Sequence, residues 1–136
     1  MTRYIVAGAL GVLMPFLALN STIAGDVPVA NPPAPKATIA VGALDKPGVY
    51  IIQAHIPANG LMRSHQHPDV RHIQIISGTL YVCDTAVVSA ATTVAHKAGD
   101  FFTIPPNTTH CSWAKDGDVD YLEVGVGPSG TKFIEK

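Results

Sequence analysis

From Val49 onward the chain alternates short apolar runs with glycine- and proline-containing turns. These runs are rich in β-branched and aromatic residues and cover 49–56, 72–76, 79–82, 101–104, 109–113, 121–126 and 131–134. Polar and apolar residues alternate in 72–76, as expected of a strand with one buried face. No segment beyond residue 24 shows the spacing of apolar positions expected of a helix. The pattern predicts an all-β domain built as a sandwich or barrel.

The first 37 residues follow a different pattern. Arg3 precedes an apolar stretch over 5–19, and small residues follow at 20–24. This arrangement predicts a signal peptide over 1–24, cleaved after Ala24, with an uncleaved N-terminal anchor as the alternative. The Pro/Ala-rich stretch 25–37 is typical of an extended linker, and the folded domain is expected at 38–136. We therefore expect a periplasmic or secreted protein with no membrane attachment after cleavage.

The charge of the chain excludes one class of partner. It has nine basic and ten acidic residues, a formal net charge of −1, and removal of Arg3 with the signal would make this −2. No run of Lys or Arg occurs anywhere in the sequence. Nucleic-acid binding therefore has no electrostatic basis here.

Three histidines carry the candidate chemistry. His65 and His67 flank a single residue, and His110 follows roughly forty residues later behind a Pro-Pro-Asn turn. Side chains two apart in a strand point to the same face, so His65 and His67 would form a clamp for a metal. His110 from a neighbouring strand would complete a set of three imidazoles. These ligands predict a divalent transition metal: iron, manganese, nickel, copper or zinc.

Two stretches around these histidines resemble the cupin superfamily. Residues 60–78 resemble its first motif, with a glycine, the His-x-His pair and a hairpin glycine. Residues 99–110 resemble its second motif, in which Gly and Pro precede a turn and the final histidine. The resemblance, to small single-domain bacterial cupins with a cupin-2-like conserved barrel, implies a small jelly-roll β-barrel with a ligand cavity. It also implies that His65, His67 and His110 are three of the four family metal ligands. Cupin barrels often dimerise, so the resemblance also allows a homodimer.

The fourth ligand is where the sequence departs from the family. Cupins commonly place a glutamate after the second histidine with three or four residues between them, and here those positions hold Arg71 and His72. Counting back from Gly78 favours Arg71 in that position. Chemistry favours His72, because a guanidinium cannot bind a cation. His72 is therefore a candidate fourth ligand, and Arg71 either pairs with Asp69 or lines the cavity and grips a substrate carboxylate.

Two cysteines, Cys83 and Cys111, remain in the predicted exported chain. An oxidising compartment permits a disulfide between them, but the sequence alone does not show that they are near each other. Strand alternation predicts that Cys111 points away from the metal that His110 faces. A disulfide and two buried thiols both remain open.

Two functions follow from this site. The first is a metal-dependent oxidoreductase, such as an iron dioxygenase, acting on a small organic molecule at a three- or four-histidine site. The alternative is a non-catalytic periplasmic protein that binds a metal or small anionic ligand. A structural barrel whose metal site has decayed is a third hypothesis. No catalytic base can be nominated, because Glu123 is the only acidic residue deep in a strand run and a structural role is expected for it.

Overall fold

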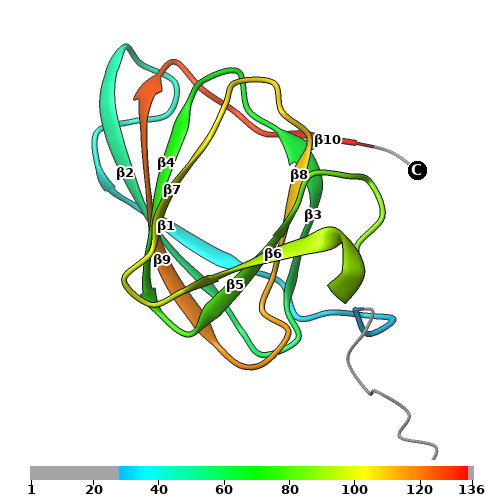
Figure 1. The fold of residues 1–136 in the computed structure, drawn as a ribbon. Helices are drawn as coiled ribbons and strands as arrows, with labels where there is room; N and C mark the ends of the chain where they lie inside the picture. The colour runs from blue at the N-terminus through cyan, green and yellow to red at the C-terminus, as the bar shows by residue number, and fades with distance from the viewer. Residues whose placement is uncertain (1–27, 135–136) are drawn as a thin grey trace, which may run out of the picture.

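The computed structural model describes residues 28–134 as two antiparallel sheets that face each other (Figure 1). One sheet has the strand order β1-β2-β9-β4-β7 and the other β10-β3-β8-β5-β6. The predicted signal peptide and the first residues of the predicted linker lie outside the described residues. No helix within 28–134 is long and apolar enough to cross a membrane.

The strands are short, and one 3₁₀ turn, η1, interrupts them. In chain order they are β1 (Lys36–Val41), β2 (Gly48–Ile56), β3 (Leu61–Gln66), β4 (Arg71–Ser77), β5 (Thr79–Cys83), η1 (Ala90–Thr92), β6 (Thr93–Lys97), β7 (Phe101–Ile104), β8 (His110–Trp113), β9 (Val119–Gly127) and β10 (Lys132–Phe133).

The core lies between the two sheets and is made by alternate residues of each strand. In β2, for example, Tyr50, Ile52, Ala54 and Ile56 are buried while Gln53 is exposed. Because successive side chains of a strand point to opposite faces, alternation of this kind buries one face and leaves the other outside. The buried apolar cluster comprises Tyr50, Ile52, Ala54, Ile56, Ile73, Ile75, Leu80, Ile104, Ala114, Val119 and Tyr121.

The predicted all-β jelly-roll barrel is confirmed. The predicted runs nevertheless omit β1, β3 and β6, although the histidine pair at 65 and 67 was expected to lie in extended backbone. The reason is plain for β1 and β6. All six residues of β1 are exposed, and β6 has no buried residue, so neither strand has the buried alternation that marked the others. β1 begins at Lys36, inside the stretch expected to be linker.

The two cysteines form a disulfide across β5 and β8. Cys83 lies directly opposite Cys111 in the register of these antiparallel strands, with 5.1 Å between their Cα atoms. Both side chains are buried. The disulfide closes the question that the sequence left open and joins the strand of His110 to its neighbour.

Candidate metal centre

His65, His67 and His110 come together inside the barrel. His65 on β3 lies directly opposite His110 on β8, and their ring centroids are 4.1 Å apart. The His67 ring follows on the same side, 4.7 Å from that of His65 and 5.2 Å from that of His110. All three are buried, and one nitrogen from each lies within 4.8 Å of the others. The expected clustering of the three histidines is therefore present.

A turn in the second motif holds together the two segments that carry the histidines. Asn107 adopts a positive φ of 59°, which asparagine tolerates better than most residues. Its backbone N–H donates to the carbonyl of His67 at 2.7 Å. The Pro-Pro-Asn turn thus ties the start of β8 to the end of β3, the two segments that carry the histidines.

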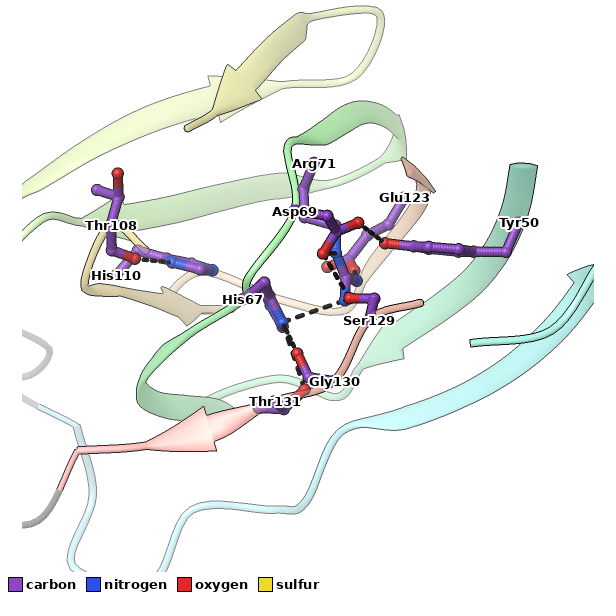
Figure 2. Close-up of polar contacts among 10 residues, drawn as sticks. All are labelled: Tyr50, His67, Asp69, Arg71, Thr108, His110, Glu123, Ser129, Gly130 and Thr131. Atoms are coloured by element: carbon purple, nitrogen blue, oxygen red, sulfur yellow. Dashed lines mark hydrogen bonds and ion pairs between the residues drawn. The ribbon is translucent and has the colours of Figure 1, made fainter. Parts of the chain in front are cut away.

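Each imidazole is oriented by a backbone carbonyl. The Nδ1 atom lies 2.6 Å from the Arg63 carbonyl in His65, 2.8 Å from that of Gly130 in His67, and 2.9 Å from that of Thr108 in His110 (Figure 2 draws the last two). A carbonyl only accepts, so each Nδ1 carries the hydrogen and donates it. This tautomer leaves the lone pair on Nε2, the arrangement in which a ligating histidine is held by its other ring nitrogen.

The same burial keeps the rings neutral. Desolvation, reinforced by the neighbouring His110, lowers the pKa of His65 to about 3. Desolvation lowers the pKa of His67 to about 4, against the opposing effect of its bond to Gly130, and it also lowers the pKa of His110. Metal binding requires the neutral imidazole. Three neutral, correctly oriented nitrogen donors suit the borderline transition metals, so the residues fit the group that the sequence predicted.

Arg71, and not His72, points into the barrel. Residues of β4 alternate between buried and exposed, so Arg71 is 2% exposed while His72 faces outward. The His72 ring stacks on Phe101, its Nδ1 contacts the Thr103 hydroxyl at 3.0 Å, and it lines a separate outer hollow of about 220 Å³. The prediction of His72 as a candidate fourth ligand is therefore corrected, because its position in the pleat places it on the opposite face of the sheet from the three histidines.

Arg71 is held by two carboxylates in a buried network (Figure 2). Its Nη1 donates to Glu123 Oε2 at 2.6 Å, and its Nε donates to Asp69 Oδ1 at 3.2 Å. Its Nη2 donates to the Ser129 hydroxyl at 2.9 Å. The guanidinium also lies over the ring of Tyr50, 5.0 Å from its centroid. Of the two alternatives for Arg71, its pair with Asp69 is therefore present, with both side chains largely buried.

Asp69 is the most heavily bonded acid in this network. Burial opposes its ionisation, yet hydrogen bonds donated by Ser129, Tyr50 and Arg71 together lower its pKa. Burial raises the pKa of Glu123, and Arg71 opposes that rise. Arg71 Nη2 also lies 3.1 Å from His67 Nδ1, but both nitrogens carry hydrogen when Nδ1 donates to Gly130, so this approach is a close contact between the network and the histidine cluster and not a hydrogen bond.

Gly125 makes room for this network and was not singled out as a site residue from the sequence. A Cβ at this position would lie 2.0 Å from the Tyr50 hydroxyl and 2.5 Å from Asp69 Oδ2. A glycine inside an otherwise apolar strand is a sign of such close approach, so a signal was present. The roles of Ser129 and Tyr50 had no comparable local signal, because their partners are distant in the sequence.

A cavity of about 310 Å³ opens beside His67. None of the residues that line it is acidic, the lining residues being Gln66, His67, Pro68, Asn107, Gly130, Thr131 and Lys132. Of the three histidines, only His67 lines this cavity.

Comparison with known proteins identifies the fold. No protein-family profile and no curated protein matches the sequence. Among solved structures, a Klebsiella pneumoniae protein with a double-stranded β-helix domain superposes with a TM-score of 0.62 at 20% identity, over 76% of this chain and 86% of that one. A cupin superfamily protein from Desulfitobacterium hafniense gives 0.57 at 11% identity, over 71% and 81% of the respective chains.

A third similar structure is a point mutant of salicylate 1,2-dioxygenase from Pseudoaminobacter salicylatoxidans, in complex with gentisate. It superposes with a TM-score of 0.63 at 17% identity and matches 81% of this chain but only 31% of the dioxygenase. The chain therefore has the cupin fold, and it corresponds to about a third of that enzyme.

Proposed function

We propose that this chain is a metal-dependent oxidoreductase that binds a divalent first-row transition metal at His65, His67 and His110 and acts on a small anionic organic molecule. The orientation of the three imidazoles carries the proposal, since each Nδ1 is held by a carbonyl and each Nε2 is left to bind. A bound metal would supply redox or Lewis-acid chemistry at the positions that three ligands leave open. The dioxygenase among the structures of similar fold supports this reaction class by analogy.

The cavity supports the choice of an anionic substrate. Three neutral imidazoles leave the charge of a dication uncompensated, which favours a negatively charged ligand. Lys132, Gln66 and Asn107 are among the residues that line the cavity beside His67, and none of its lining residues is acidic. A substrate carboxylate would meet hydrogen-bond donors there without like-charge repulsion.

The buried acids restrict the reaction. Asp69 and Glu123 both accept hydrogen bonds from Arg71, so neither is free to take a proton from a substrate. We therefore assign the role of general base to neither of these carboxylates. The same observation favours a second candidate function, a non-catalytic protein that captures a metal or a small anion.

We also propose that the chain is exported with cleavage after Ala24. The disulfide supports an oxidising compartment, because such bonds rarely persist in a reducing cytosol. The mass of the N-terminal peptide of the purified protein tests this directly. An intact Met1 end on the folded, oxidised protein would refute cleavage.

The decisive experiment measures metal content. The exported protein, purified without an affinity tag, should hold about one equivalent of a transition metal, and His65→Ala/His67→Ala should hold none. His72→Ala is the matched control and should keep the metal. If the wild-type protein binds no transition metal after reconstitution, the proposal fails.

Turnover separates the enzyme from the binding protein. Oxygen consumption by the metal-loaded protein with gentisate and related aromatic carboxylates would support the oxidoreductase. Binding of benzoate without turnover of any such compound would favour capture. In both cases Lys132→Gln should weaken benzoate binding more than benzamide binding, and Lys97→Gln, on a strand away from the cavity, should change neither.

A further inference from the structure

The C-terminal strap, residues 128–134, is fastened to both the metal-binding strand and the buried network. Its strand β10 pairs with the end of β3, with Phe133 opposite His65 and Lys132 opposite Gln66. Figure 1 shows β10 running beside β3 at one end of the barrel. The Ile134 N–H donates to the carbonyl of Ser64 at 2.9 Å. The strap therefore follows the segment that carries two of the three histidines.

Ser129 anchors the other end of the strap. Its N–H donates to the Leu44 carbonyl at 2.7 Å. Its hydroxyl accepts from Arg71 Nη2 at 2.9 Å and donates to Asp69 (Figure 2). One small side chain thus joins the strap to the buried charges.

Between these anchors the strap touches the histidines themselves. The Gly130 carbonyl accepts the Nδ1–H of His67, and the Thr131 hydroxyl lies 3.4 Å from the same nitrogen. The ring of Phe133 lies 5.9 Å from that of His65. His110 is oriented differently, by the carbonyl of Thr108 from its own segment.

The strap is held weakly by comparison with the core strands. β10 has two residues, and the side chains of Thr131, Lys132 and Phe133 are all exposed. Few apolar groups are buried, so polar contacts provide most of its attachment. Segments of this kind open locally at a much lower free energy than the global unfolding transition.

We propose that the C-terminal strap is a working part of the metal centre, positioning His67 through Gly130, and that metal binding and docking of the strap stabilise each other. This inference rests on the proposed function, since it requires the three histidines to bind a metal. A docked strap fixes the His67 tautomer that binds. If docking of the strap raises metal affinity by some factor, thermodynamic linkage requires that a metal bound to Nε2 of His67 favours docking of the strap by the same factor. Ser129 is a positioning residue that acts through Asp69, Arg71 and the strap.

Hydrogen exchange tests the coupling in the wild-type protein. Cobalt(II) is added to the metal-free exported chain, and amide exchange is followed by mass spectrometry in peptides covering 128–134 and 93–100. We expect cobalt to slow exchange in the strap by about 5- to 150-fold, the usual range of coupling between linked sites. Exchange in 93–100, on β6 at the far edge of the same sheet, should not change. Equal exchange in the strap with and without bound cobalt would overturn the proposal.

Variants at Ser129 test its positioning role. Ser129→Ala should weaken cobalt affinity about tenfold and alter the cobalt d–d absorption, and Ser129→Thr, which keeps the hydroxyl, should restore both. Ser77→Ala, which removes an exposed hydroxyl bonded to Asp120, is the control and should change neither. Unchanged affinity and spectrum in Ser129→Ala would refute the role of Ser129. Should the alanine variant fail to fold, the wild-type exchange experiment still decides the coupling.

The outcomes also separate this inference from the proposed function. Cobalt that binds at one equivalent without affecting the strap would leave the proposed function standing and overturn the inference. Failure of the wild-type protein to bind cobalt or any other transition metal would refute both.

Discussion

Replacing Arg71 with methionine should destabilise the protein at neutral pH by about 3–5 kcal/mol, the cost of leaving buried charges without their partner. Arg71 is 2% exposed and donates to Glu123 at 2.6 Å, to Asp69 at 3.2 Å and to Ser129 at 2.9 Å. Methionine keeps an unbranched chain of similar length, so the change removes charge more than volume. Since small domains have total stabilities of about 5–15 kcal/mol, the loss would be large.

Urea denaturation of the metal-free protein measures this cost, with Arg63→Met as the matched control. The Arg63 guanidinium is exposed and lies 5.3 Å from the centroid of the Phe133 ring, a contact worth about 0.5–1 kcal/mol. A loss below about 1 kcal/mol in Arg71→Met would refute the argument that the buried charges depend on Arg71.

The pH dependence of Arg71→Met gives a second test of the same reasoning. Burial already raises the pKa of Glu123 in the wild type, and removal of the cation should raise it further. A carboxyl whose folded pKa lies above its unfolded value destabilises the folded state as pH rises through the folded pKa. The difference in unfolding free energy between variant and wild type should therefore shrink as pH falls from 7 to 5. A constant difference would show that the cost is one of packing rather than charge.

Three further predictions concern the barrel and its site. Removal of the disulfide by Cys83→Ala/Cys111→Ala should cost about 3.6 kcal/mol in a urea titration, the chain-entropy value for a separation of 28 residues; a loss below about 1 kcal/mol would contradict it. Gly125→Ala should lower the free energy of unfolding by about 1–3 kcal/mol in the same assay, because its Cβ would lie 2.0 Å from the buried Tyr50 hydroxyl. A urea midpoint equal to that of the wild type would show that Tyr50 and Asp69 move aside without cost. In the metal-free protein, the pKa is about 3 for His65 and about 4 for His67, both below the unfolded value of 6.5. Their contribution to the free energy of unfolding is therefore fully present above pH 6.5. It is lost as pH falls toward 4 for His67 and toward 3 for His65. Each should contribute about 1.4 kcal/mol per pH unit within its window, and His65→Gln should flatten the measured slope between pH 6 and 5.

Local alternation explains why much of the fold and site could be predicted from the sequence. His65 and His67 share a face because side chains two apart in extended backbone must do so. The same rule, counted back from Gly78, places Arg71 inside and His72 outside. Ligand chemistry favoured His72 and the count favoured Arg71, and the structure agrees with the count because residue type does not change which way a strand position points. β1 and β6 lie outside the predicted runs because neither contains a buried residue, so neither shows a buried alternation.

The sequence by itself determined which side chains share a face, and so the all-β class and the histidine pair, but it left Arg71 and His72 as alternatives for the inward position. These follow from the covalent geometry of extended backbone, which each strand carries within itself. Only the tertiary structure decided what each inward side chain meets. The Cys83–Cys111 disulfide depends on the register of β5 against β8, and the partners of Arg71 include Glu123 on β9 and Ser129 near the C-terminus. Register and closure depend on packing between segments far apart in the chain, which no local pattern records.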